Sequence, residues 1–180
     1  MTQKEHLLVH IDALYRSALY LAKNESSADD LVQETYLKAF KFLRDDEEIR
    51  NVKAWLFRIL MNTFINKYRK DKREPSLVDF DSVEAFHESI QEEAMAPSVL
   101  DDESALDSLV NDNIKGALEA LPDDFRMVVL LSIVEGFSYK EIAKIVNRPV
   151  GTVMSRMYRG RKMLKEKLSG YAKKYGYDRD

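Results

Sequence analysis

The 180-residue sequence contains no cysteine. Disulfide bonds, zinc sites built on thiolates and direct sensing of oxidants by a thiol are therefore excluded for this chain. Glycine and proline are also scarce, with six and four residues, which favours helices over strands and turns. No apolar run approaches the roughly 20 residues of a membrane helix. The first ten residues lack the basic and then apolar pattern of a signal peptide, so we expect a cytoplasmic protein without membrane insertion.

Charge is distributed unevenly along the chain, although the formal net charge is only −3. Residues 74–112 hold 12 acidic side chains and no lysine or arginine, whereas residues 1–73 carry 14 basic and 11 acidic side chains. Residues 113–180 carry 14 basic and 8 acidic side chains. This distribution predicts an all-α chain in which two small, basic helical domains, residues 1–73 and 113–180, are joined by a flexible acidic linker over residues 74–112.

Residues 138–168 have the pattern of a helix-turn-helix. Ser138, with Glu141 three positions later, predicts a capping box at the start of the first helix, and Pro149 interrupts the helical pattern. The second helix is expected to begin near residues 151–152. At about 100° per residue, its buried side comprises Val153, Met157, Gly160, Leu164 and Leu168.

The other side of this second helix presents hydroxyl and guanidinium groups on its first turns, which suits entry into a major groove. A solvated charged face would give the same pattern on a single helix, but the turn before it and the basic residues after it favour DNA. We expect contacts with duplex DNA from seven residues: Arg148, Gly151, Thr152, Ser155, Arg156, Arg159 and Lys162.

A second informative stretch is the helix predicted within residues 52–73. Opposite its apolar face lies a narrow stripe formed by Trp55, Arg58, Asn62, Asn66 and Arg69. Indole stacks on an unpaired base, amides read base edges and guanidinium groups hold phosphates. The alternative is a core tryptophan on a helix that ends in a solvated basic run, and this stretch by itself does not decide between the two.

Other helices are predicted over residues 4–23, over residues 28–43 with a capping box from Ser27, and from residue 113 to Pro122. The nearly all-apolar segment that follows Pro122 and ends at Gly136 is expected to form the core against which the helix-turn-helix packs. His6 and His10 share a helical spacing, but no third ligand accompanies them. We therefore expect neither a metal site nor a cofactor.

Three segments, in this order, resemble an extracytoplasmic-function (ECF) sigma factor, the promoter-recognition subunit of bacterial RNA polymerase: ADDLVQETYLKAF, AWLFRILMNTFINKYRKDKRE and ALPDDFRMVVLLSIVEGFSYKEIAKIVNRPVGTVMSRMYRGRKML. The resemblance implies a protein without catalytic residues that binds core RNA polymerase and then promoter DNA. Residues 44–50 and the Trp55 stripe match the part that melts and reads the −10 element. The second helix of the helix-turn-helix matches the reader of the −35 element. The residues that match the family's polymerase contact are Asp30, Gln33 and Glu34.

The resemblance also implies a protein partner. The form GTVMSR…RGR, together with LxxNTFINxYRK, is closer to the branch that responds to thiol-oxidative stress, in which a zinc-binding anti-sigma factor is the partner. The sensing cysteines would then lie in that partner, because this chain has none. Met154 departs from the lysine or arginine that many members carry at its position.

Two other classes of function compete with a sigma factor. A conventional helix-turn-helix regulator would bind a symmetric operator as a dimer. An enzyme acting on nucleic acid would need clustered carboxylates or metal ligands in a basic domain, whereas the acidic residues are concentrated in the linker. We therefore do not expect an enzyme.

Overall fold

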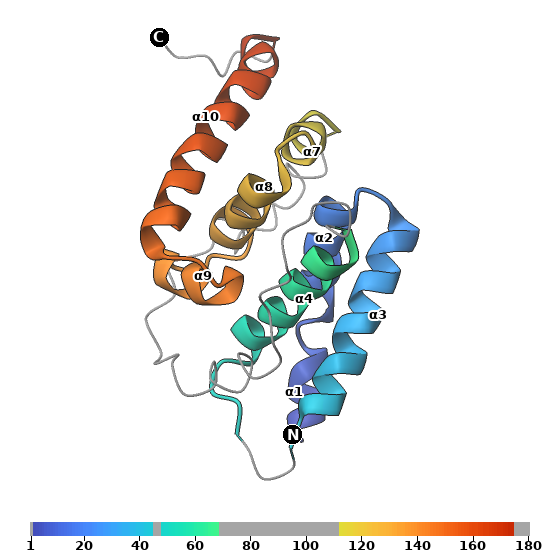
Figure 1. The fold of residues 1–180 in the computed structure, drawn as a ribbon. Coiled ribbons are helices and arrows are strands. Elements are labelled where there is room, and N and C mark those ends of the chain that lie inside the picture. The colour runs from blue at the N-terminus through green and yellow to red at the C-terminus, as the bar shows by residue number, and fades with distance from the viewer. Residues whose placement is uncertain (1, 45–47, 69–111, 175–180) are drawn as a thin grey trace. The chain divides into compact units, whose positions relative to one another are not determined.

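The computed structural model describes residues 2–44, 48–68 and 112–174, and the regular structure in these ranges is entirely helical (Figure 1). The all-α prediction is thus confirmed. The chain divides into two compact units. The predicted linker lies outside the described residues except for Asp112, with which the first helix of the second unit begins. Among the described residues, no helix has both the length and the apolar character needed to cross a membrane.

The described residues 2–44 and 48–68 of the first unit form four helices, in which α2, α3 and α4 lie side by side and α1 packs against α4 (Figure 1). Each helix turns a face of apolar side chains inward, as the spacing of these residues along the sequence requires. Fully buried side chains of this unit include Leu7, Leu14, Leu31, Leu56 and Leu60. The bounds are Gln3–Leu8 for α1, Ile11–Ala22 for α2, Glu25–Phe42 for α3 and Val52–Tyr68 for α4.

The single helix predicted over residues 4–23 is wrong, because the chain forms two helices that are separated at Val9 and His10. The carbonyl oxygen of Leu7 accepts hydrogen bonds from the backbone N–H of His10 at 3.3 Å and from the hydroxyl of Tyr36 at 2.8 Å. Tyr36 lies on α3, 29 positions along the chain. The Tyr36 hydroxyl thus supplies a hydrogen-bond donor to a carbonyl at the end of α1. Because this donor comes from another helix, the periodicity of residues 4–23 does not indicate the break between α1 and α2.

The start of α3 also differs from the prediction. Asn24, rather than Ser27, is the capping residue: its side chain accepts a hydrogen bond from the backbone N–H of Ser27 at 2.8 Å, and the helix begins at Glu25. Both residue types favour the capping position, and the chain uses the earlier one. Phe40, which the pattern assigns to the packed face of α3, is 39% exposed, and its ring lies tilted against that of Tyr36 with the ring centroids 6.0 Å apart.

In the second unit, α10 packs along α8 and α7 (Figure 1). The apolar segment predicted as the core is buried and consists of α8 followed by one π-helical turn, η1, before Gly136 adopts a positive φ of 74°. Buried Arg126 ties α7 to α8: its guanidinium donates to the carbonyls of Glu119 (3.2 Å) and Leu121 (2.8 Å) and pairs with Asp123 (2.7 Å). The bounds are Asp112–Glu119 for α7, Asp123–Val129 for α8, Leu130–Val134 for η1 and Val150–Lys174 for α10.

The helix-turn-helix is formed by α9 (Tyr139–Val146) and α10. The predicted capping box is confirmed, since Ser138 Oγ accepts from the N–H of Glu141 at 3.2 Å and the Glu141 carboxylate accepts from the N–H of Ser138 at 2.8 Å. In the turn, Asn147 has a φ of 51°, a left-handed conformation that asparagine tolerates better than most residues. The carbonyl of Pro149 then accepts the first helical hydrogen bonds of α10, from Thr152 and Val153.

Candidate nucleic-acid interface

One side of α10 is exposed over its first three turns. Val153 and Met157 are buried, and Gly160 lies so close to α8 that a Cβ there would be 2.7 Å from Val129 Cγ2. These contacts fix which side of α10 faces solvent. The predicted DNA contacts on that exposed side are Gly151, Ser155, Arg159 and Lys162.

The other predicted contacts of α10 are partly covered. Arg156 lies at the edge of the buried side, and its guanidinium pairs with the Asp124 carboxylate at 3.3 Å. The Arg156 side chain is 18% exposed. Burial, and then the positive charge of Arg148, lowers the pKa of Arg156 below its ordinary value. Arg148 and Thr152 are also only partly exposed. The structure therefore separates the set predicted from sequence into freely exposed and partly covered members.

Two exposed apolar residues of α10, Met154 and Tyr158, were not assigned to either side by the sequence analysis. They fall outside the spacing of the buried side, and that mismatch in an otherwise polar stretch is the signal that identifies them.

On α4, the stripe predicted to contact unpaired bases is not an open surface. Trp55, Arg58 and Asn62 are 1%, 2% and 8% exposed, and Asn66 is partly exposed. Every residue from 54 to 64 is buried, so burial alone does not distinguish the stripe from the apolar face of this helix. Arg69 lies outside the described residues.

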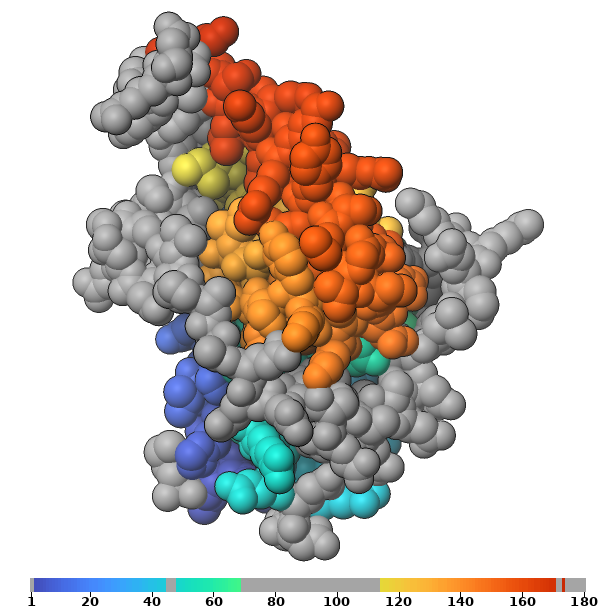
Figure 2. All heavy atoms as spheres, turned by 90° about the vertical axis from the view of Figure 1, so that its left-hand side faces the viewer, coloured from blue at the N-terminus to red at the C-terminus, as the bar shows by residue number. Residues whose placement is uncertain are grey.

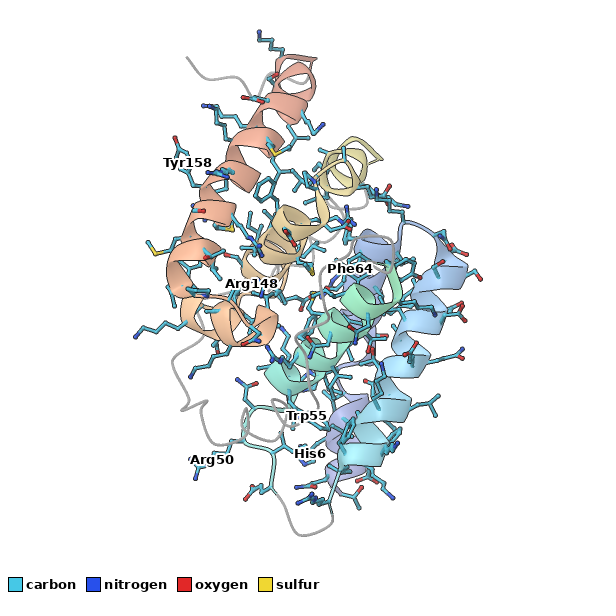
Figure 3. All side chains as sticks on the ribbon, viewed as in Figure 1. His6, Arg50, Trp55, Phe64, Arg148 and Tyr158 are labelled. Atoms are coloured by element: carbon cyan, nitrogen blue, oxygen red, sulfur yellow. The ribbon has the colours of Figure 1, made fainter. Side chains whose placement is uncertain are left out.

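The loop before α4 has an exposed arginine. Arg50 is exposed, while its neighbour Ile49 is 9% exposed and anchors the loop. Figure 3 shows Arg50 on this connection and Trp55 near the start of α4. Asn51 caps the N-terminus of α4: its Oδ1 accepts a hydrogen bond from the backbone N–H of Ala54 at 3.0 Å. The cap sets where α4 starts relative to the loop that carries Arg50.

The outer side of α3 presents the predicted polymerase contacts. Asp30 and Gln33 are exposed, and the Glu34 carboxylate pairs with Lys38 at 2.8 Å and with Lys67 of α4 at 3.9 Å. Between these polar residues lies Leu37, which is 71% exposed. Leu37 was not among the contacts predicted from the sequence, although a leucine on a polar face is itself a sign of a contact surface.

Within the part of the chain that the structure describes, no group of three or more histidine, cysteine, aspartate or glutamate side chains has an arrangement suited to a metal ion. The arrangement of charged and hydroxyl groups on α10 is suited to phosphates and base edges instead.

Comparison with known families gives two matches, one in each unit. Residues 8–74 match the family model described as sigma-70 region 2, and residues 111–164 match the one described as sigma-70, region 4. Together they cover the helices of the first unit from α2 onward and the helix-turn-helix of the second.

Curated relatives resemble the chain over most of its length. The ECF RNA polymerase sigma factor SigE of Mycolicibacterium smegmatis is 31% identical over 163 residues, which are 91% of this chain and 60% of that protein. The ECF RNA polymerase sigma factor SigW of Bacillus subtilis is 29% identical over 89% of this chain and 85% of its own length. The ECF RNA polymerase sigma-E factor of Escherichia coli K12 is 31% identical over 92% of this chain and 87% of its own length.

Two solved structures are similar in fold. One is the sigma factor RpoE in complex with the anti-sigma factor NepR from Bartonella quintana, with a TM-score of 0.64, 31% identity and coverage of 92% of this chain and 96% of that one. The other is CnrH in complex with the cytosolic domain of CnrY, with a TM-score of 0.58 over 92% of this chain and 86% of that one. At 23% identity, this second similarity concerns the fold alone.

Proposed function

This chain belongs to the ECF family of RNA polymerase sigma factors, and from that premise we propose that its second unit reads a −35 element and its first unit opens a −10 element. The observation that carries the proposal is the exposed side of α10, where Ser155 and Arg159 lie on the second helix of a helix-turn-helix. The family matches in both units support a bipartite reader rather than a regulator that binds an operator as a dimer.

For the −35 element, the exposed residues of α10 act as two groups. Ser155 and Arg159 are close enough to the helix N-terminus to reach base edges in a major groove, and arginine is the most frequent partner of guanine there. Lys162, one turn further on, is suited to a phosphate. Arg156 is held against α8 by Asp124, and Arg148 and Thr152 flank it. Gly151 lies on the open surface of α10, since a Cβ there would meet nothing within 4 Å.

For the −10 element, the proposed contacts are on α4: Trp55, Arg58, Asn62, Asn66 and Arg69. The combination of an indole with amides and guanidinium groups is the one that holds unstacked bases. Because Trp55, Arg58 and Asn62 are buried in this chain, contact with an extruded base requires that this side of α4 be uncovered. Residues 44–50 are proposed to take part with α4, and exposed Arg50 supplies a positive charge next to the start of this helix.

The proposed contact with core polymerase is the outer side of α3, formed by Asp30, Gln33 and Glu34. Exposed Leu37 supplies an apolar centre to this polar surface, as expected for a protein interface whose rim is charged. We further propose that the chain works in the cytoplasm with the polymerase.

We also propose an anti-sigma factor as a partner, because a solved relative is bound to one. The finer assignment to the thiol-oxidative branch rests on the motifs GTVMSR…RGR and LxxNTFINxYRK. It predicts a zinc-binding anti-sigma factor that carries the sensing cysteines, since this chain contains none.

The division of labour between the units is tested with holoenzyme reconstituted from the full chain and core polymerase. Arg159→Ala is expected to weaken discrimination at the −35 element by about 1–3 kcal/mol, without slowing strand opening at a promoter that is already bound. Asn62→Ala is expected to slow opening, followed with a fluorescent base in the −10 element, and to leave binding to duplex −35 DNA unchanged.

Because Asn62 is buried, fluorescence of Trp55 serves as the check that the Asn62→Ala variant is folded. If both variants lost only duplex affinity, the proposed division of labour would be wrong.

A further inference from the structure

The exposed side of α10 includes an apolar row that the proposed function does not use. Val150, Met154 and Tyr158 follow one another at intervals of four residues and are 38%, 53% and 74% exposed. Residues four apart lie one above the other on a helix. Figure 2 shows the atoms of α10, orange to red, as a continuous part of the surface on this side. Figure 3 shows the Tyr158 side chain pointing away from α10 on the side opposite to α8.

Tyr158 lies at the edge of the predicted DNA surface, about 20° around the helix from Gly151. At about 100° per residue, it is within about 60° of both Ser155 and Lys162 around the helix. It is about 160° away from Gly160, the residue that lies closest to α8. A duplex that meets Ser155 and Lys162 is therefore within reach of the Tyr158 ring beside them, with Met154 one turn before it.

The charges around this row favour a polyanion. Residues 150–165 contain five cations, Arg156, Arg159, Arg161, Lys162 and Lys165, and no acidic residue. A neutral apolar row embedded in positive charge is suited to an apolar group that is carried by a polyanion. In the major groove of DNA, the only apolar group on a base edge is the C5-methyl of thymine.

We propose that Met154 and Tyr158 are specificity-determining residues that contact thymine methyl groups in the −35 element. This inference rests on the proposed function, in which α10 enters the major groove. Arginine and lysine around the row position the duplex through its phosphates, which carry no sequence information, whereas the thioether and the ring distinguish thymine from the other bases.

The test removes the methyl group and nothing else. Promoters are first selected from a randomised library by holoenzyme made with the full chain. Each thymine of the selected −35 element is then replaced by deoxyuridine, which lacks only the C5-methyl. We expect affinity to fall by roughly threefold to tenfold at one or two positions, the loss that follows from exposing about one buried methyl group.

Protein variants then assign the contact. Tyr158→Ala and Met154→Ala are expected to bind the thymine and deoxyuridine promoters equally at the position that each residue contacts. The matched variants Tyr158→Phe and Met154→Leu keep the apolar surface and are expected to keep the preference for thymine. Both residues are exposed, so these changes leave the core of the second unit intact.

Four results would overturn the inference. The first is a selected −35 element without thymine on either strand, and the second is equal affinity of the unaltered holoenzyme for thymine and deoxyuridine at every position. The third is that both alanine variants still discriminate fully between thymine and deoxyuridine. The fourth is that the alanine variants bind DNA normally but lose a protein partner. The last result would identify the row as a protein-docking surface. If no promoter is selected at all, the proposed function fails, which is a different outcome from a promoter that is bound without regard to its methyl groups.

Discussion

In the second unit, α10 comes into close contact with α8 at Gly160. A Cβ at this position would lie 2.7 Å from Val129 Cγ2 and 3.7 Å from Phe125 Cβ. The glycine thus lets α10 pack directly on α8, and this contact fixes which side of α10 faces solvent. A single missing side chain positions the residues proposed to read DNA.

We predict that Gly160→Ala destabilises the second unit by about 1–3 kcal/mol, because the added methyl overlaps a buried valine that has few alternative rotamers. Gly170→Ala, further along the same helix, is the matched control. A Cβ there meets nothing within 4 Å, so alanine should stabilise the helix by up to about 1 kcal/mol. Hydrogen exchange of the α8 and α10 amides measures both changes. Equal protection in the two variants would contradict the packing argument.

A second residue-scale feature is the ion pair between Arg156 and Asp124, which joins positions 32 apart in the sequence. Periodicity places Arg156 among the DNA contacts, but it does not reveal a carboxylate supplied by α8. Buried Arg126, which ties α7 to α8, is likewise not apparent from the pattern. Such contacts between distant residues depend on the fold and were not predictable from local sequence.

We predict that Asp124→Asn raises the affinity for DNA of any sequence by about threefold to tenfold at low salt, because Arg156 is then available to a phosphate. The slope of log affinity against log salt should become steeper by about one phosphate contact. Filter binding over a salt series measures this effect. The double variant Asp124→Asn, Arg156→Gln should show no gain relative to Arg156→Gln; a persisting gain would mean that the change in net charge, and not the ion pair, is responsible.

At the scale of elements, the sequence predicts most helices and their buried sides. The capping box of Ser138 and Glu141, the end of a helix at Pro122 and the apolar core before Gly136 are local signals, and all appear in the structure. The break between α1 and α2 was not predictable, because the Tyr36 hydroxyl that satisfies the carbonyl of Leu7 comes from another helix. Nor does periodicity predict that α4 is buried on every side from residue 54 to 64.

The bond between Tyr36 and Leu7 should make the first unit sensitive to alkali. Burial, and then the negative charge of Asp12, raises the pKa of Tyr36 from 10.0 to about 12. The folded state therefore favours the neutral phenol. This contribution to stability is fully present below about pH 10, the ordinary value for tyrosine, and is lost as the pH rises toward 12.

We predict that Tyr36→Phe lowers the free energy of unfolding by about 0.5–1.5 kcal/mol at neutral pH, through the lost hydrogen bond. Between pH 10 and 12, the gap between the two proteins should narrow. Urea unfolding followed by fluorescence of Trp55, the single tryptophan, reports on this unit. Tyr68→Phe, at an exposed position of α4, is the control, and a constant gap for Tyr36→Phe over this pH range would contradict the assignment.

At the scale of the whole molecule, the proposed function requires two DNA-reading parts in one chain. The counts of charged residues are 14 basic and 11 acidic over residues 1–73, and 14 basic and 8 acidic over residues 113–180, with 12 acidic residues between. In the proposed function, positive charge in both parts serves contact with DNA, whereas DNA repels the negative charge of residues 74–112. The family could be inferred from sequence motifs in both parts. Which of the predicted contact residues are exposed could not be inferred, because exposure depends on packing such as that around Trp55 and Arg156.

The central claim is that this chain confers promoter specificity on core RNA polymerase. Run-off transcription on a promoter library, with core enzyme in the presence and absence of the chain, tests it most directly. We predict defined transcripts only when the chain is present, and their loss when Arg159→Ala is combined with Asn62→Ala. A folded chain that yields no promoter-specific transcript with any bacterial core enzyme, or that binds a symmetric operator as a dimer without polymerase, would contradict the claim.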